Sequence, residues 1–357
     1  MTRDHNPVAV VAGGTAGVGR ATVDALIARG YRVAVLARGE ARLAQMQQEL
    51  GAQIWTRALD VSDGDAVMRA ASDIASDLGA PEIWVNSAML TSFSTFDMVD
   101  EAEFRKITDT TYLGTVNGCR AALSVMAQGN IVNVGSGLAY VSVPGQAAYC
   151  GAKHAVRGFT QALRIELARE GRPITLSMVQ LPAVNTPQFD WARNRLDRHP
   201  QPAPPIFQPE VAARGILRAI DQNAREILVG RSVLKLLIGN ILFPPLVERQ
   251  LTEMGIETQK SDRPDTDARD NLDGPHPDIS ARAHGGFDAR AKDDGITLDS
   301  DAARKTLAFG GAAALLGLGY LLGRGLTSGS SPKVEAREKP DRHPASPAYR
   351  RPTEYRV

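Results

Sequence analysis

Cysteine is scarce in this chain of 357 residues, which contains only Cys119 and Cys150. Their positions match no disulfide framework or metal-binding spacing, so we expect a reducing compartment and no metal site. An excess of charge of one sign is also missing, because 41 Lys and Arg residues balance 40 Asp and Glu residues. The resulting net charge of +1 gives no indication of a nucleic-acid partner.

No secretory signal is visible in the first residues, MTRDHNP, which are polar and lead directly into an apolar run. The protein is therefore expected in the cytoplasm. A hydrophobic content of 43% over this length is ample for a large core.

Apolar runs alternate with helical patterns along the first 230 residues. Strands are predicted at 8–12, 32–37, 54–59, 82–87, 130–135, 174–180 and 226–229. Helices are predicted at 17–29, 40–50, 63–78, 100–127, 148–170 and 209–222. This order predicts an α/β fold, a Rossmann-type doubly wound parallel sheet with right-handed crossovers. The wide apolar faces of helices 100–127 and 148–170 are either buried within the chain or pair in a homodimer or homotetramer.

A glycine-rich turn follows the first strand. The run VAVVAGGTAGVG contains Gly13, Gly17 and Gly19, and residues with helical spacing come directly after it. A strand, a glycine turn and a helix N-terminus together let the backbone approach a pyrophosphate closely. We therefore predict a dinucleotide site here, with Thr15 and Val18 in the same turn contributing to it.

The ends of the next strands indicate which dinucleotide is bound. The second strand ends at Ala37 and Arg38 without a carboxylate, and Arg20 supplies a second cation. An arginine suits a ribose 2′-phosphate, so NADP(H) is favoured over NAD(H), unless Arg38 merely ends a surface strand. Asp60 and Val61 at the third strand end are expected at the adenine. Asn86 ends the fourth strand at the same sheet edge.

Tyr149 and Lys153 are four residues apart on a predicted helix, so they lie on one face of it. A cation beside a phenol lowers the phenol pKa, which makes the pair a candidate proton donor and acceptor. Ser136, at the end of the preceding strand, could hold a substrate oxygen for that acid.

These motifs together resemble the short-chain dehydrogenase/reductase family, single-domain branch. The resemblance covers roughly residues 7–230 and rests on Gly13-x3-Gly17-x-Gly19, Asp60-Val61, Asn86-Ser87-Ala88-Met89, Ser136, Tyr149-x3-Lys153 and Pro182-Ala183-Val184-Asn185-Thr186. It implies that Tyr149 is the general acid/base, that Lys153 lowers its pKa and binds the nicotinamide ribose, and that Ser136 orients the substrate oxygen. It also implies that Pro182, Val184 and Thr186 contact the cofactor, with Thr186 near its carboxamide.

Three positions depart from the family pattern. Ser87 and Met89 replace residues of the usual Asn-Asn-Ala-Gly run, and Thr111 stands where a catalytic asparagine commonly completes the set. A threonine cannot reproduce both amide functions of asparagine. These departures motivate a second hypothesis, a catalytically weak NADP-binding sensor or scaffold protein at a membrane.

Two segments after the sixth strand are candidates for the substrate site. Residues 186–208 contain Phe189, Trp191 and Phe207 and are interpreted as a substrate lid for a bulky apolar alcohol or ketone, or as a purely structural loop. The apolar segment 232–251 could extend the substrate pocket, pack on the domain or lie on a membrane surface.

The remaining chain is expected to leave the catalytic domain, which is placed at residues 1–255. Residues 256–305 are rich in charge, Pro and Gly and are predicted to be disordered. Residues 306–323 are eighteen uncharged residues, predicted as a short apolar helix that either contacts the cytoplasmic side of a membrane or docks on protein. Residues 324–357 are expected to be a disordered tail. The sequence as a whole predicts an NADP(H)-dependent oxidoreductase that interconverts a carbonyl and a secondary alcohol.

Overall fold

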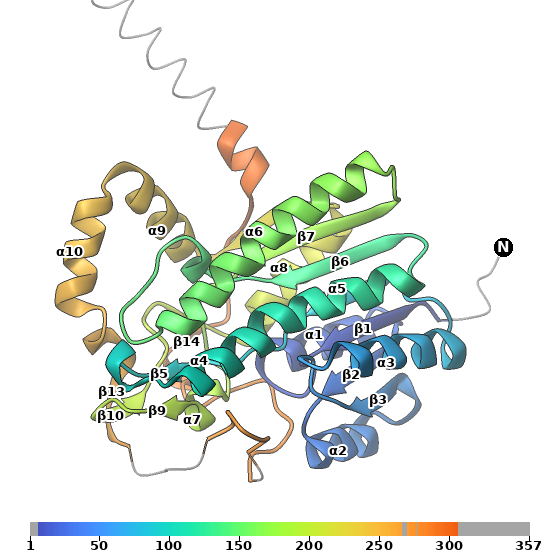
Figure 1. Ribbon diagram of the computed structural model, residues 1–357, viewed down its shortest axis with the longest axis horizontal. Helices are drawn as coiled ribbons and strands as arrows, with labels where there is room; N and C mark the ends of the chain where they lie inside the picture. Colours follow the sequence, from blue (N-terminus) through green and yellow to red (C-terminus); the bar gives the residue numbers. More distant parts are fainter. Residues whose placement is uncertain (1–5, 266–269, 277, 306–357) are drawn as a thin grey trace, which may run out of the picture. The chain divides into compact units, whose positions relative to one another are not determined.

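The computed structural model describes residues 6–265, 270–276 and 278–305. Within these ranges eight strands form a central sheet, and all neighbours run parallel except β15, which is antiparallel to β12 (Figure 1). In spatial order the strands are β15 (Thr297–Asp299), β12 (Glu226–Val229), β7 (Ile174–Gln180), β6 (Gly129–Val134), β4 (Ile83–Asn86), β1 (Val8–Ala12), β2 (Arg32–Ala37) and β3 (Ile54–Ala58). All seven predicted strands are present, and their order confirms the doubly wound sheet.

Helices cover both faces of the sheet because the strands are apolar on both sides. One face packs against α1 (Gly17–Ile27), α2 (Glu40–Leu50) and α8 (Pro209–Asp221). The other face packs against α3 (Gly64–Asp77), α5 (Gly114–Val125) and α6 (Ala147–Arg169), while α4 (Glu101–Thr108) precedes α5. Two buried core clusters, one on each side of the sheet, hold the layers together.

The helix predicted at 100–127 is interrupted. A π-helical turn, η3 (Asp109–Leu113), separates α4 from α5. Thr111 lies in this π-helical turn. Its hydroxyl donates a hydrogen bond to the carbonyl oxygen of Leu90, on the loop after β4, and accepts one from the Leu90 amide. Such bulges occur frequently at functional sites.

The segment 232–251 forms two helices, α9 (Gly230–Leu242) and α10 (Pro244–Met254). The predicted lid, 186–208, contains the short helix α7 (Gln188–Trp191) and several short strands. The short strands are β5 (Ser92–Phe93), β8 (Ala183–Val184), β9 (Arg193–Asn194), β10 (Arg198–Pro200), β11 (Ile206–Phe207), β13 (Lys260–Pro264) and β14 (Ala291–Lys292). The short 3-10 turns are η1 (Gly51–Gln53), η2 (Phe96–Met98), η4 (Gly137–Ala139), η5 (Glu257–Gln259) and η6 (Asp288–Arg290).

The prediction that residues 256–305 are disordered is wrong for the part of this segment that the structure describes. β15 extends the central sheet, and Leu272, Ala281 and Phe287 are buried in separate apolar clusters. A few apolar residues are enough to order this segment, because each packs into a cluster formed by the rest of the domain and because the backbone of β15 pairs with β12. The first compact unit therefore ends at Lys305 rather than at residue 255.

The apolar stretch 306–323 and the tail 324–357 lie outside the described residues. Among the helices that the structure does describe, none combines the length and the apolar character needed to cross a membrane.

Candidate active site

Three glycines shape the turn between β1 and α1. The backbone at Gly13 and Gly17 has positive φ angles of 84° and 55°, which residues with a side chain rarely adopt. A Cβ at Gly13 would lie 2.6 Å from the amide nitrogen of Ala88, and one at Gly19 would lie 2.0 Å from the Gly13 carbonyl oxygen. The turn therefore presents bare backbone at the N-terminus of α1, where amide groups and the helix dipole favour an anion.

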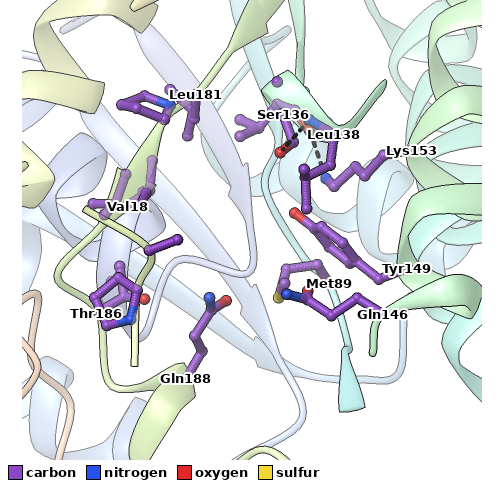
Figure 2. Close-up of a pocket in the computed structure, with 18 of the residues that line it drawn as sticks. Val18, Met89, Ser136, Leu138, Gln146, Tyr149, Lys153, Leu181, Thr186 and Gln188 are labelled. Atoms are coloured by element: carbon purple, nitrogen blue, oxygen red, sulfur yellow. Dashed lines mark hydrogen bonds between the residues drawn. The ribbon is translucent and has the colours of Figure 1, made fainter. Parts of the chain in front are cut away.

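Tyr149, Lys153 and Ser136 meet in one cavity. Figure 2 shows the phenol oxygen of Tyr149, near the start of α6, pointing toward Ser136 at the end of β6. The Lys153 ammonium lies 5.6 Å from the centroid of the Tyr149 ring and donates a hydrogen bond to the carbonyl oxygen of Val134 at 2.7 Å. The Ser136 hydroxyl accepts a hydrogen bond from the amide of Leu138 at 3.1 Å.

The pKa of Tyr149 differs from the sequence-based prediction. Burial raises the pKa of the phenol, and its hydrogen bond with Ser136 offsets only part of that increase. Burial also lowers the pKa of the Lys153 ammonium to about 8, and the ammonium donates a hydrogen bond to the carbonyl oxygen of Val134. The chain's own groups therefore keep Tyr149 protonated at neutral pH.

Thr111 lies behind the cavity rather than in its wall. Its fully buried hydroxyl donates to the carbonyl oxygen of Leu90 at 3.1 Å and accepts from the Leu90 amide at 3.0 Å. Its neighbour Thr110 lines the cavity, and the Thr110 hydroxyl is buried without a hydrogen-bond partner among the described residues. The prediction of Thr111 as a catalytic residue is therefore wrong in placement: Thr111 fixes the loop after β4, and Thr110 faces the site.

Two guanidinium groups line the cavity beside the end of β2. Arg38 donates hydrogen bonds to the backbone oxygens of Asn271 at 2.6 Å and Leu272 at 3.2 Å. Arg42, one turn into α2, stacks 4.8 Å from the ring centroid of Trp191. Burial lowers the pKa of both groups, and the charge of Arg38 lowers that of Arg42 further.

Arg42 is the residue that sequence reasoning missed. Its Nε and Nη1 atoms are buried, and no hydrogen-bond partner is found for them in the part of the chain that the structure describes. No motif in the sequence marks Arg42, because Arg38 precedes α2 and the helical four-residue spacing does not relate the two residues. Arg20, predicted as the second cation, is instead held by Asp24 at 3.0 Å and Glu49 at 2.9 Å outside the cavity wall.

The third and fourth strand ends differ in what they present. Asp60 and Val61 line the cavity, and the Asp60 carboxylate is held by Lys106 at 3.0 Å. Asn86 does not line the cavity, which corrects its prediction as a cofactor-binding side chain. Its amide is buried between Trp84 and Asn133, at 2.9 Å and 2.8 Å, and therefore braces the sheet beneath the site.

Every other predicted site residue lines the same cavity. These residues are Gly13, Thr15, Gly17, Val18, Gly19, Arg38, Asp60, Val61, Ser136, Tyr149, Lys153, Pro182, Val184 and Thr186. Figure 2 shows Val18, Leu181 and Thr186 on the wall opposite Tyr149 and Met89, with Gln188 between the two walls.

The cavity has a volume of about 830 Å³ and continues from the glycine turn past Tyr149 to an apolar end. Side chains of α9 and α10, including Leu236, Val247 and Leu251, form that end, so 232–251 extends the pocket, one of the three alternatives for that segment. Phe189 and Trp191 of the predicted lid also line it. No cluster of three or more His, Cys, Asp or Glu side chains suited to a metal ion occurs within the described ranges.

Comparison with known proteins agrees with this geometry. Residues 7–196 match the family model described as short chain dehydrogenase. The chain is 29% identical over 266 residues to the uncharacterized oxidoreductase YxnA of Bacillus subtilis, covering 72% of this chain and 74% of the relative. It is 30% identical over 243 residues to the putative oxidoreductase SadH of Mycobacterium tuberculosis, covering 64% and 88%. A solved short-chain dehydrogenase from Streptomyces avermitilis is similar with a TM-score of 0.60 and 25% identity, covering 70% of this chain and 96% of that one.

Proposed function

The chain belongs to the short-chain dehydrogenase family, and on that premise we propose that it is an NADP(H)-dependent oxidoreductase that interconverts a carbonyl and a secondary alcohol. The observation that carries the proposal is the meeting of Tyr149, Ser136 and Lys153 in a cavity that continues to the glycine turn. Proton transfer needs a donor at the reacting oxygen, and the bare turn can accept a pyrophosphate beside it.

The residues present fit a dinucleotide with a 2′-phosphate. The glycine turn keeps bare backbone beside the cavity, because a Cβ at Gly13 or Gly19 would collide with neighbouring backbone, and Asp60 and Val61 border the proposed adenine end. Arg38 and Arg42 line the same part of the cavity, and Nε and Nη1 of Arg42 have no hydrogen-bond partner among the described residues, so a 2′-phosphate there would be bound by two guanidinium groups. When bound, the nicotinamide supplies or accepts the hydride.

Tyr149, Ser136 and Lys153 have separate roles in the proposed proton transfer and cofactor binding. Tyr149, which burial keeps protonated, donates its proton to a carbonyl oxygen, while the Ser136 hydroxyl orients that oxygen. Lys153 is placed to hold the ribose that carries the reacting ring. The protonated phenol is the form that acts as the acid in carbonyl reduction.

The apolar end of the cavity supports a bulky, fairly apolar substrate. Side chains of α9 and α10 provide an apolar surface that would exclude water from the substrate. Burial of such surface contributes about 25 cal/mol for each Å² of apolar area removed from water.

Replacement of Tyr149 by Phe tests the proposal. We expect turnover of NADPH with a panel of apolar ketones and aldehydes to fall by at least about 1000-fold, because the proton donor is lost. NADPH affinity, measured by fluorescence titration, should stay within about twofold of the parent protein, since no contact to the phosphates changes.

Activity near the parent level in Tyr149→Phe would contradict the role of the phenol. NADPH binding without turnover of any panel member by the parent protein would favour the sensor or scaffold function instead.

A further inference from the structure

Residues 270–276 and 278–287, named here the strap, lie between β13 and β14 in the sequence (orange in Figure 1). The first part passes beside β2, where backbone oxygens of Asn271 and Leu272 accept hydrogen bonds from Arg38. Asn271 lines the cavity, and Leu272 is 1% exposed in a cluster that includes Tyr149. The strap therefore contacts Arg38, at the proposed 2′-phosphate site, and also packs in the cluster that includes Tyr149, the proposed proton donor.

The second part of the strap lies against the glycine turn. The amide of Gly17 donates to the carbonyl oxygen of Arg282 at 3.0 Å, and Arg20 donates to the carbonyl oxygen of Ala281 at 3.3 Å. The amide of Ala281 in turn donates to Gln45 of α2 at 2.9 Å. These contacts join the strap to the start of α1 and to α2 on either side of the cavity.

The strap is anchored to the substrate lid as well. Arg193 forms ion pairs with Asp270 at 2.6 Å and Asp273 at 2.8 Å. Asp190 pairs with Arg282 at 3.0 Å.

A third anchor lies at Gly285, where a Cβ would approach the carbonyl oxygen of Thr186 to 2.5 Å. Since these contacts combine ion pairs with close backbone packing, the strap holds a defined position over the cavity.

We propose that the strap is a closing element of the cofactor site, so that the dinucleotide enters and leaves only when the strap detaches from Arg193 and the glycine turn. The proposal rests on the proposed binding of NADP(H) in this cavity. The proposal is based on the contacts of the strap, which bonds to Arg38, to the amide of Gly17 and to the lid residue Arg193. A ligand beneath such a cover leaves at the rate at which the cover opens.

The double variant Asp270→Asn, Asp273→Asn in the full chain tests the strap. It removes both ion pairs to Arg193 without changing a residue of the catalytic or glycine-turn machinery. We expect NADPH to dissociate about tenfold faster than from the parent protein, because the strap opens more often. The rate is measured by stopped-flow loss of NADPH fluorescence after addition of excess NADP⁺.

Asp221→Asn is the matched control, since it breaks the ion pair of Asp221 with Arg29, 2.7 Å long and distant from the strap. Its dissociation rate should equal that of the parent. Equal rates in the double variant and the parent would overturn the strap while leaving the cofactor assignment intact. Absence of NADPH binding in the parent would overturn both.

Hydrogen exchange gives a second readout that does not depend on the variants. Saturating NADPH should slow amide exchange across 278–287 several-fold, because the bound ligand stabilises the closed strap. Unchanged exchange in that segment at saturating NADPH would overturn the proposal.

Discussion

Lys153 is a buried cation whose function conflicts with folding. Its side chain is 3% exposed, and burial lowers its pKa from 10.5 to about 8. The unfolded chain thus holds a proton that the folded chain releases between about pH 8 and 10.5, so the free energy of unfolding rises with pH across that window. Below pH 8 the full penalty applies, which amounts to about 3 kcal/mol.

Lys153→Met should therefore stabilise the protein while abolishing turnover. At pH 7 we expect a gain of about 2 kcal/mol, because relief of the charge penalty outweighs the lost hydrogen bond to Val134. The gain should disappear by about pH 10.5, where the unfolded lysine also loses its proton. Urea unfolding at both pH values measures this. Lys292→Met, at an exposed position, should change neither value, and a destabilised Lys153→Met at pH 7 would contradict the argument.

Arg42 carries the residue-scale prediction for the cofactor. Arg42→Ala should weaken NADPH binding by about 10- to 100-fold, because a charge-assisted contact contributes about 1.5–3 kcal/mol. NADH binding should change little, since NADH lacks the 2′-phosphate. Fluorescence titration with both cofactors gives the ratio. Arg105→Ala, in an exposed ion pair with Glu101, is the control, and an unchanged ratio in Arg42→Ala would remove the structural reason for NADP(H).

Much of the site at residue scale could be predicted from sequence because its residues follow strand ends. Gly13, Asp60 and Ser136 reach the cavity through that rule, whereas Tyr149 is found by its four-residue spacing from Lys153 on α6. The rule fails for Asn86, since it places a residue at an edge without saying where its side chain points. Thr111 was misplaced for a similar reason, because the π-helical turn changes which of two adjacent threonines faces the site.

At the scale of elements, α5 packs very closely against β4 at Gly118. A Cβ at Gly118 would lie 2.0 Å from Oδ1 of Asn86. Asn86 cannot move aside without losing its hydrogen bonds to Trp84 and Asn133. The glycine thus sets the distance between this helix and the sheet.

Gly118→Ala should destabilise the fold by about 2–4 kcal/mol, because it overpacks a buried, hydrogen-bonded site. Gly158→Ala on α6 is the matched control, since no atom lies within 4 Å of its added Cβ. That control should be neutral or up to about 1 kcal/mol more stable through helix propensity. Thermal unfolding of both variants measures the difference, and equal stabilities would refute the close contact.

Helices and strands with a clear period were predictable, whereas elements formed by distant contacts were not. The apolar runs of β1 and β7 predict both strands from the sequence alone. β15 is three residues long and includes Asp299, so nothing local marks it as a strand. It exists because β12 offers an unpaired edge and because Arg218 and Arg225 bind its backbone and the adjacent Asp301.

On the scale of the molecule, the compact unit includes the segment after residue 255. β15 covers the edge of β12, and Phe287 fills an aromatic cluster with Phe93 and Phe189. The prediction of disorder from composition was wrong here, because the average is dominated by charged residues and gives little weight to the few apolar residues that pack into buried clusters.

A chain ending at residue 305 should keep the melting temperature of the full protein within about 2 °C, since the compact unit is complete. A chain ending at residue 255 should fail to unfold cooperatively, because it exposes an apolar strand edge and loses buried side chains. Circular dichroism and calorimetry compare the two. Cooperative melting of the shorter chain at the parental temperature would restore the boundary predicted from composition.

The hydrogen bond from Arg20 to Ala281 joins positions 261 residues apart, and this separation has a consequence for biosynthesis. Translation begins at the N-terminus, so the glycine turn and Arg20 leave the ribosome long before Ala281 is synthesised. A nonsense mutation between codons 154 and 281 would accordingly yield a product that keeps Tyr149 and Lys153 but lacks the contact of Arg20 with Ala281. The contact between these two segments therefore forms only after residue 281 has been synthesised.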